Sequence, residues 1–229
     1  MDYSQDLIAL WLTLKLASLT TLILLAIGLP LAWRLAQYQG SAKPIIEALI
    51  ALPLVLPPTV LGFYLLIAFA PNTWFGQAWL WLTGSQLAFS FSSILLGSLL
   101  YSLPFVVQPL HTSFMQLNQH YHAVAASLGL SLNARVRFIT LPLIKPALIS
   151  AATLGFAHTL GEFGLVLMLG GNIPGQTQVL SIALYNHVEA LEYSHAHQLA
   201  GLLLGLSFIG LVLLYKFNRP SFSTVAKQS

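Results

Sequence analysis

Residues 111–145 read HTSFMQLNQHYHAVAASLGLSLNARVRFITLPLIK, a polar insert between long apolar runs. Within it, Gly129 permits a turn that a residue with a Cβ would resist. Pro142 lacks the amide hydrogen that a helix interior needs, so we expect a helical piece over residues 132–140 to stop before it. With a further helix over residues 119–127, the insert predicts two short helices that meet at an angle outside a membrane.

The rest of the chain has the composition of a membrane protein. Charged residues make up 7% of the 229 residues and hydrophobic residues 57%. A soluble domain of this length would need far more charge to cover its surface. Apolar runs long enough to cross roughly 30 Å of hydrocarbon recur along the sequence. We therefore predict an all-α integral membrane protein with five transmembrane helices, at residues 7–33, 45–70, 87–110, 146–169 and 199–217.

Six crossings are the alternative, with an additional helix at residues 74–82 or 179–193. The N-terminus carries Asp2 and Asp6 and no cationic region, so we do not expect a cleaved signal peptide. The absence of cysteine excludes disulfides and thiolate metal sites. We expect one membrane domain over residues 7–217, followed by a polar tail at residues 218–229.

The positive charges predict the orientation, because Lys and Arg in short loops stay on the cytoplasmic side. Eight of the nine basic residues follow predicted spans one, three or five: Arg34, Lys43, Arg135, Arg137, Lys145, Lys216, Arg219 and Lys227. Four of the six acids fall on the opposite side: Asp2, Asp6, Glu189 and Glu192. The N-terminus is thus expected outside and the C-terminus in the cytoplasm. Cations spread over three loops explain the basic character without a nucleic-acid partner.

The insert also resembles a known family. Gly129, nine residues, Ile139, one residue, Leu141 and Pro142 resemble the second half of the EAA motif, the coupling loop of binding-protein-dependent ABC importer permeases of the type I fold. In that family the loop docks on a separate ATPase subunit. Where the motif has Glu-Ala-Ala this chain has Ala-Val-Ala, so any interaction of that carboxylate is lost. The resemblance assigns ATPase coupling to Ala123, Val124, Ala125, Ala126, Ser127, Leu128, Gly129, Leu130, Ile139, Leu141 and Pro142.

Four other stretches resemble the molybdate permeases of this family: LPLVLPPTVLG at 52–62, LAFSF at 87–91, LGEFG at 160–164 and GNIPGQTQ at 171–178. The IPGQT sequence favours molybdate over the sulfate or thiosulfate of related permeases, and tungstate stays open as a second cargo. The resemblance implies a homodimer in the bacterial inner membrane, surrounded by lipid. It also implies two cytoplasmic ATPase subunits and an extracytoplasmic molybdate-binding protein.

Catalysis is expected on another chain. No ATP-binding glycine loop of the GxxxxGKS type occurs in this sequence, so ATP and magnesium are assigned to the partner ATPase. We expect no cofactor or metal on this chain, and we do not expect it to be an enzyme. An ion-driven secondary transporter is a rival, which would take up substrate without an ATPase.

Residues within spans two and four are candidates for a gate or pathway. Pro57 and Pro58 should kink span two near its middle, as a hinge or as a static bend. Gly155, Gly161 and Gly164 would let helices approach closely in span four, with a packing role first and a gating role second.

Glu162 is the one acid well within a predicted span, where a charge usually faces protein or water. His158 precedes it by four residues, so the two side chains could share a hydrogen bond on one helical face. We expect Glu162 to be paired structurally or placed near the outer gate. A different class, an intramembrane metalloenzyme using His158 and Glu162, lacks an HExxH sequence or further ligands.

The segment between spans four and five is a candidate contact for the binding protein. Asn172, Ile173, Pro174 and Gly175 lie in a turn-rich loop, and an amphipathic piece follows at residues 181–193. His195 and His197 are two histidines without a third ligand at a recognised spacing, so we interpret them as solvated loop residues.

We predict that Gly129→Asp abolishes coupling to the ATPase, because a side chain at this position would disturb the turn of the insert. Membrane insertion should be unaffected, as judged by the amount of protein in the membrane fraction. Molybdate uptake by cells carrying the variant measures the coupling, and normal uptake would contradict the assignment.

Overall fold

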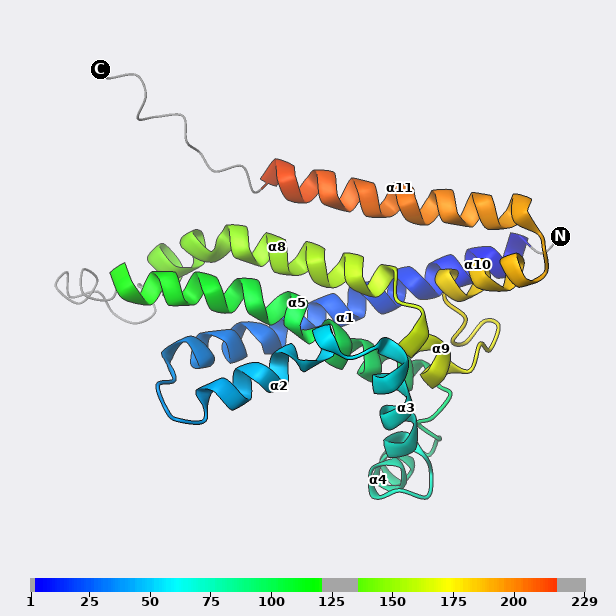
Figure 1. The fold of residues 1–229 in the computed structure, drawn as a ribbon, viewed down its shortest axis with the longest axis horizontal. Coiled ribbons are helices and arrows are strands. Elements are labelled where there is room, and N and C mark those ends of the chain that lie inside the picture. The colour runs from blue at the N-terminus through cyan, green and yellow to red at the C-terminus, as the bar shows by residue number, and fades with distance from the viewer. Residues whose placement is uncertain (1–2, 121–135, 218–229) are drawn as a thin grey trace, which may run out of the picture.

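The computed structural model describes residues 3–120 and 136–217, and within these ranges all regular structure is helical (Figure 1). The elements are α1 (Tyr3–Gln37), α2 (Lys43–Val55), α3 (Pro58–Phe69), α4 (Trp74–Thr83), α5 (Phe91–His120), a π-helical turn η1 (Val136–Thr140), α8 (Leu141–Leu160), α9 (Gly164–Gly170), α10 (Leu180–Glu189) and α11 (Tyr193–Phe217). Most of the predicted coupling residues, 123–130, lie outside the described residues.

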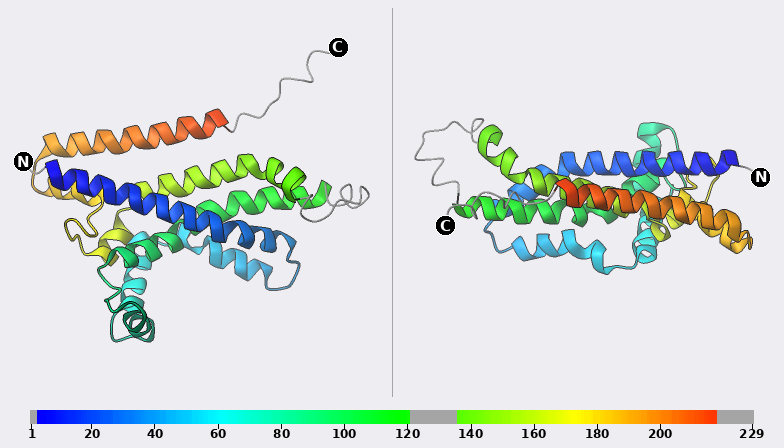
Figure 2. Two further views of the ribbon diagram at one scale, coloured as in Figure 1. Left: turned by 180° about the vertical axis from the view of Figure 1, so that it is seen from behind. Right: turned by 90° about the horizontal axis from the view of Figure 1, so that it is seen from above.

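Long helices α1, α5 and α8 form the centre of the molecule (Figures 1 and 2). The core between these three helices is almost fully buried and contains Leu24, Val106, Leu110, Ile144 and Ala151. Helix α11 packs on α8 and α10, but most of its apolar side chains are exposed. Such a surface suits lipid or another helix, because lipid tails are as apolar as these side chains.

The expected number of spans agrees with the described part of the chain. It contains four helices that are long and apolar enough to cross a membrane, and five spans if the bent pair of α2 and α3 is counted as one. The two regions that could have raised the count to six do form helices, α4 and α10. Each has 10 residues, which is about 15 Å of helix and half the thickness of the hydrocarbon layer.

The predicted kink in span two is confirmed. Helices α2 and α3 meet at an angle of 110°. Leu56 and Pro57 between them are extended, with ψ of 134° and 136°. Pro58 then occupies the first position of α3, where its missing N–H removes no helical hydrogen bond. As a result α3 and α4 lie across the direction of the long helices (Figure 1).

The prediction of one continuous helix over residues 146–169 is wrong. Helix α8 ends at Leu160, and α9 starts a separate short helix at Gly164. The backbone leaves the helical conformation at Gly161 (ψ 4°) and Phe163 (φ −124°). The apolar run continues through this break, so hydropathy alone does not reveal it.

Helix ends differ from the expectation in three other places. Helix α5 continues through residues 111–120 of the insert, and α11 begins at Tyr193 rather than at residue 199. The helical piece expected to stop before Pro142 runs from η1 directly into α8. Pro142 lies in the first turn of α8, where an amide hydrogen is not needed for the intrahelical ladder.

Charge is divided between the two ends of the bundle. At one end α1 and α11 finish and α2 and α8 begin, with the basic side chains Arg34, Lys43, Lys145 and Lys216 (Figure 1). At the other end α1 begins and α10 passes into α11, with the acids Asp6, Glu189 and Glu192.

Gly155 confirms the expectation of close helix packing. A Cβ built on it would lie 2.8 Å from Cγ2 of Val106 in α5, and Val106 is fully buried. We predict that Gly155→Ala lowers the free energy of unfolding by about 1–3 kcal/mol, because the added methyl group would overlap the buried Val106 side chain and force a shift in the packing. Chemical unfolding in detergent measures this. Gly205→Ala is the control, since nothing lies within 4 Å of that site, and equal stability of the two variants would contradict the prediction.

Candidate functional site

The break between α8 and α9 places the Glu162 carboxylate inside the protein. The residue is 5% exposed, and its Oε2 accepts a hydrogen bond of 2.8 Å from the Ser98 hydroxyl of α5. Its backbone carbonyl, which the broken helix leaves free, accepts a bond of 2.7 Å from Ser181 of α10. The break is therefore held by hydroxyl groups from two neighbouring helices.

The second carboxylate oxygen of Glu162 lacks a hydrogen-bond donor among the described residues. This atom, Oε1, is buried. Leaving a polar atom unpaired in an apolar layer costs free energy, and such atoms are uncommon in native structures. Only a water molecule or a change of conformation would satisfy this oxygen.

His158 does not pair with Glu162, contrary to the expectation. Its Nδ1 lies 2.9 Å from the Ser102 hydroxyl, and its ring stacks on Phe105 with a centroid distance of 4.0 Å. Ser102 also lies 3.0 Å from the Thr159 hydroxyl. The helix ends between His158 and Glu162, so the spacing of four residues no longer places them on one face. The pair that the metalloenzyme alternative requires is not formed.

The two interruptions of the spans lie against each other. A Cβ on Gly164 would approach Thr59 Cγ2 to 3.3 Å and Pro58 Cγ to 3.4 Å, so α9 begins in contact with the start of α3. This confirms the close approach expected at Gly164. Gly161 does not share it, since the nearest atom to its Cβ position is a carbonyl oxygen of its own helix at 3.9 Å. The bend between α2 and α3 and the break between α8 and α9 therefore lie in one region, which includes Pro57, Pro58, Glu162 and Gly164.

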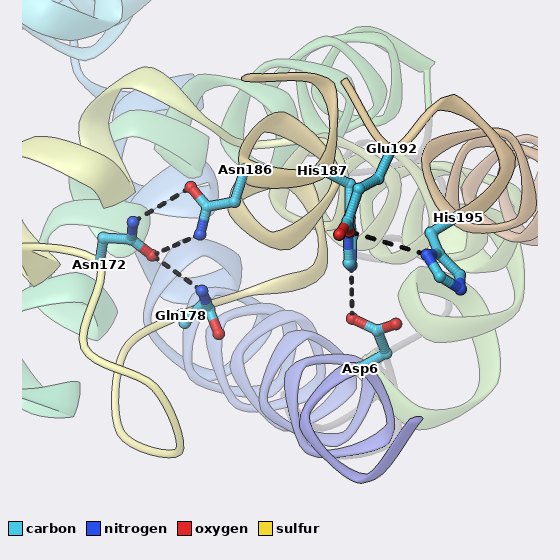
Figure 3. A network of polar contacts seen from close by, with 7 residues as sticks. All are labelled: Asp6, Asn172, Gln178, Asn186, His187, Glu192 and His195. Carbon is cyan, nitrogen blue, oxygen red and sulfur yellow. Dashed lines mark hydrogen bonds and ion pairs between the residues drawn. The ribbon is translucent and has the colours of Figure 1, made fainter. Parts of the chain in front are cut away.

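The loop after α9 is closed by its own side chains. Thr177 is fully buried, donates to the Gly170 carbonyl at 2.6 Å and accepts from the Ile173 amide at 3.1 Å. The Asn172 amide group faces inward, bonding Asn186 at 3.1 Å and Gln178 at 3.0 Å (Figure 3).

Of the four residues expected to meet a binding protein, Pro174 and Gly175 are exposed, whereas Asn172 and Ile173 are partly buried.

Beyond this loop, α10 is joined to α1. The backbone N–H of Leu180 donates to the Thr13 hydroxyl at 2.7 Å, and both residues are buried. Val179, the residue before the helix, makes no capping bond with its side chain. The hydroxyl of α1 thus satisfies an amide at the start of α10.

A cluster of ionisable side chains lies where α10 turns into α11 (Figure 3). His187 Nδ1 is 2.7 Å from Glu192 Oε2, and His187 Nε2 is 3.2 Å from Asp6 Oδ1 of α1. His195 Nδ1 is 3.7 Å from the same Glu192 oxygen. The hydrogen bond to Glu192 raises the pKa of His187, and Asp6 adds to this effect while partial burial opposes it.

The sequence interpretation missed this cluster because it paired His195 with His197. His197 is exposed, whereas His195 faces His187 and Glu192. Leu191, with φ of 61°, reverses the chain so that the Glu192 amide bonds the His187 carbonyl. The signal available in the sequence is the spacing from His187 to Glu192 to His195 across a helix end.

Three residues of the expected coupling motif are described. Ile139 lies in η1, and Leu141 and Pro142 form the first turn of α8. Leu141 is 41% exposed, so apolar surface is available at this end of the bundle. It is the end that carries the basic side chains.

The chain is similar to permeases of known transporters. Residues 25–219 match the family described as "Binding-protein-dependent transport system inner membrane component". The chain is 48% identical to molybdenum transport system permease protein ModB of Azotobacter vinelandii, over 94% of this chain and 95% of the relative. Identity to ModB of Haemophilus influenzae is 34% over 81% of each chain. Identity to sulfate transport system permease protein CysT of Salmonella typhimurium is 32%, over 83% of this chain and 68% of the relative.

A solved structure of a bacterial ABC transporter involved in the import of the acidic polysaccharide alginate has a similar fold. The TM-score is 0.70 at 16% sequence identity, and the match covers 93% of this chain and 78% of that chain.

We predict that Ser98→Ala lowers the free energy of unfolding by about 1–3 kcal/mol, because Glu162 would be left buried without its hydroxyl donor. Unfolding in detergent measures the change. Ser150→Ala is the control, since that hydroxyl bonds the Pro146 carbonyl near the surface. Glu162→Gln should be tolerated better than Ser98→Ala because its amide oxygen can still accept from Ser98. Unchanged stability of Ser98→Ala would contradict the prediction.

Proposed function

Because the chain belongs to the family of binding-protein-dependent transport system inner membrane components, we propose that it is the permease subunit of an ATP-driven molybdate importer. One observation carries the proposal, the 48% identity to ModB of Azotobacter vinelandii over nearly the full length of both chains. Sulfate permeases of the CysT type are more distant, at 32% identity for the Salmonella typhimurium protein. The fold expected from the sequence, that of a type I ABC importer permease, is confirmed by the alginate transporter.

The division of charge supports an orientation in the membrane. The end of the bundle with Arg34, Lys43, Lys145 and Lys216 is assigned to the cytoplasm, because positive side chains are retained there. The end with Asp6, Glu189 and Glu192 then faces outward. The N-terminus is outside and the polar tail at residues 218–229 is cytoplasmic. The chain is a multi-pass protein of the bacterial inner membrane.

Partners follow from what the chain cannot do alone. Five helices enclose a pore poorly, so two copies related by a twofold axis would form the pathway between them. Two ATPase subunits bind ATP and magnesium and dock on the coupling residues, 123–130 together with Ile139, Leu141 and Pro142. A binding protein delivers the anion at the opposite end, near Pro174 and Gly175. A transporter of the same fold, the bacterial alginate ABC transporter, has been solved in complex with a periplasmic protein.

The mechanism is alternating access. ATP-driven closure of the partner subunits moves the two coupling loops together and rocks the attached helices α5 and α8. The bend at Pro57 and Pro58 and the break at Glu162 lie in contact, so they form a joint at which α3 and α9 can shift relative to the long helices.

The buried hydroxyls of Ser98, Ser102 and Thr159 bond Glu162, His158 and the Gly155 carbonyl, so they hold this joint rather than line a pathway. We assign the anion to hydroxyl, amide and backbone donors that bind it weakly, because strong binding would slow its release. The Glu162 carboxylate would repel a dianion that passed close to it, so we assign Glu162 to the joint and not to the lining of the pathway.

We predict that reconstituted vesicles take up molybdate only when this chain, its ATPase and the binding protein are all present with ATP. The chain has no nucleotide-binding glycine loop, so vesicles with this chain alone should show no uptake. Uptake is measured with molybdate, tungstate and sulfate in parallel. Faster uptake of sulfate than of molybdate would indicate a sulfate permease, and uptake without the ATPase would indicate a secondary transporter.

A further inference from the structure

We propose that His187, Glu192 and His195 form a binding site for a divalent transition metal of the zinc type. The site lies at the end of the bundle where α1 begins and α10 turns into α11 (Figure 3). In the described part of the chain these three side chains can bring one ligand atom each to within 4.8 Å of one another.

All three ligand atoms lie within 4.8 Å of one another, and the two distances from Glu192 lie on either side of the separation that zinc requires. Zinc binds histidine nitrogen and carboxylate oxygen at about 2.0–2.2 Å in a tetrahedral arrangement, so its ligand atoms lie about 3.3–3.5 Å apart. Glu192 Oε2 is 2.7 Å from His187 Nδ1 and 3.7 Å from His195 Nδ1. To bind zinc, Glu192 Oε2 must move away from His187 Nδ1 and toward His195 Nδ1, each by a few tenths of an ångström or slightly more. Rotations of the Glu192 side chain, which is 52% exposed, provide such movements.

Asp6 completes the arrangement from another helix. Its Oδ1 lies 3.2 Å from His187 Nε2, the ring nitrogen opposite the one that faces Glu192. A histidine that binds a metal commonly donates its other N–H to a carboxylate, which fixes the tautomer and orients the ring. Asp6 therefore holds the proton on Nε2 and leaves Nδ1 for the metal.

The donor set and the exposure favour a particular class of ion. Two imidazoles and a carboxylate suit zinc and neighbouring first-row metals, whereas calcium and magnesium prefer oxygen ligands. The His187 and His195 side chains are 23% and 22% exposed, so an ion can enter from solvent. Three protein ligands leave a fourth position for water.

A bound ion would fasten three helices together. His187 is on α10 and His195 on α11, and Asp6 links His187 to α1. External zinc would then slow molybdate uptake, because it would restrain the outer end of the bundle. This consequence rests on the proposed function and orientation. Metal binding itself does not depend on that function.

The test is zinc binding by the full chain in lipid nanodiscs, purified without a histidine tag and measured by calorimetry at neutral pH. We expect one zinc ion per chain. His187→Ala and His195→Ala should lose this binding, while His197→Ala, a matched control on the exposed side of α11, should retain it. Asp6→Ala keeps all three ligands and should weaken binding by about 10- to 100-fold.

Gel filtration shows whether each variant is folded. If a histidine variant is misfolded, weaker zinc binding by Asp6→Ala tests the site in its place. Zinc should raise the thermal unfolding midpoint of the unmodified chain and of His197→Ala, should raise that of Asp6→Ala only at higher zinc concentration, and should leave those of His187→Ala and His195→Ala unchanged. Absence of zinc binding, or equal binding by the unmodified chain, Asp6→Ala and His195→Ala, would overturn the site. Molybdate uptake without zinc binding would refute this site alone, and zinc binding without oxyanion uptake would refute the proposed function alone.

Discussion

The structure depends on satisfying the backbone groups that a broken helix exposes inside an apolar layer. A continuous helix bonds its own amides and carbonyls, but the chain leaves the helix at Gly161, and the Glu162 carbonyl loses its partner. Ser181 supplies that partner from α10, and Ser98 holds the side chain from α5. Without hydroxyls placed on two other helices, the break would cost several kcal/mol. Helices α5 and α10 therefore each contribute a hydroxyl group to the break between α8 and α9.

Much of the fold could be predicted from the sequence, because membrane spans depend on length and hydropathy. The bend at Pro57 and Pro58 was also predictable, since two adjacent prolines remove two amide donors and disfavour helical backbone at the residue before each. The break at Glu162 was not, because Gly161 and Glu162 are both tolerated within helices and long apolar runs lie on either side of it. What ends α8 there is a set of tertiary bonds, and no local pattern encodes them.

In the candidate sites, too, local sequence patterns could be predicted and tertiary contacts could not. The coupling residues were predicted from a spacing within one segment, and because most of that segment lies outside the described residues the assignment stays a prediction. The expected bond between His158 and Glu162 was wrong because it assumed a continuous helix. The cluster of His187, Glu192 and His195 was missed because Asp6 contributes from a position 181 residues away and because Leu191 reverses the chain.

The bond between Thr13 and Leu180 has a mechanical consequence. Helix α10 has no capping side chain of its own and borrows a hydroxyl from α1, in a place that water does not reach. Sliding α1 along its axis would strand an amide in a medium that offers no substitute acceptor. Helices α1 and α10 are therefore coupled through this bond, so a displacement of either helix along its axis would be transmitted to the other.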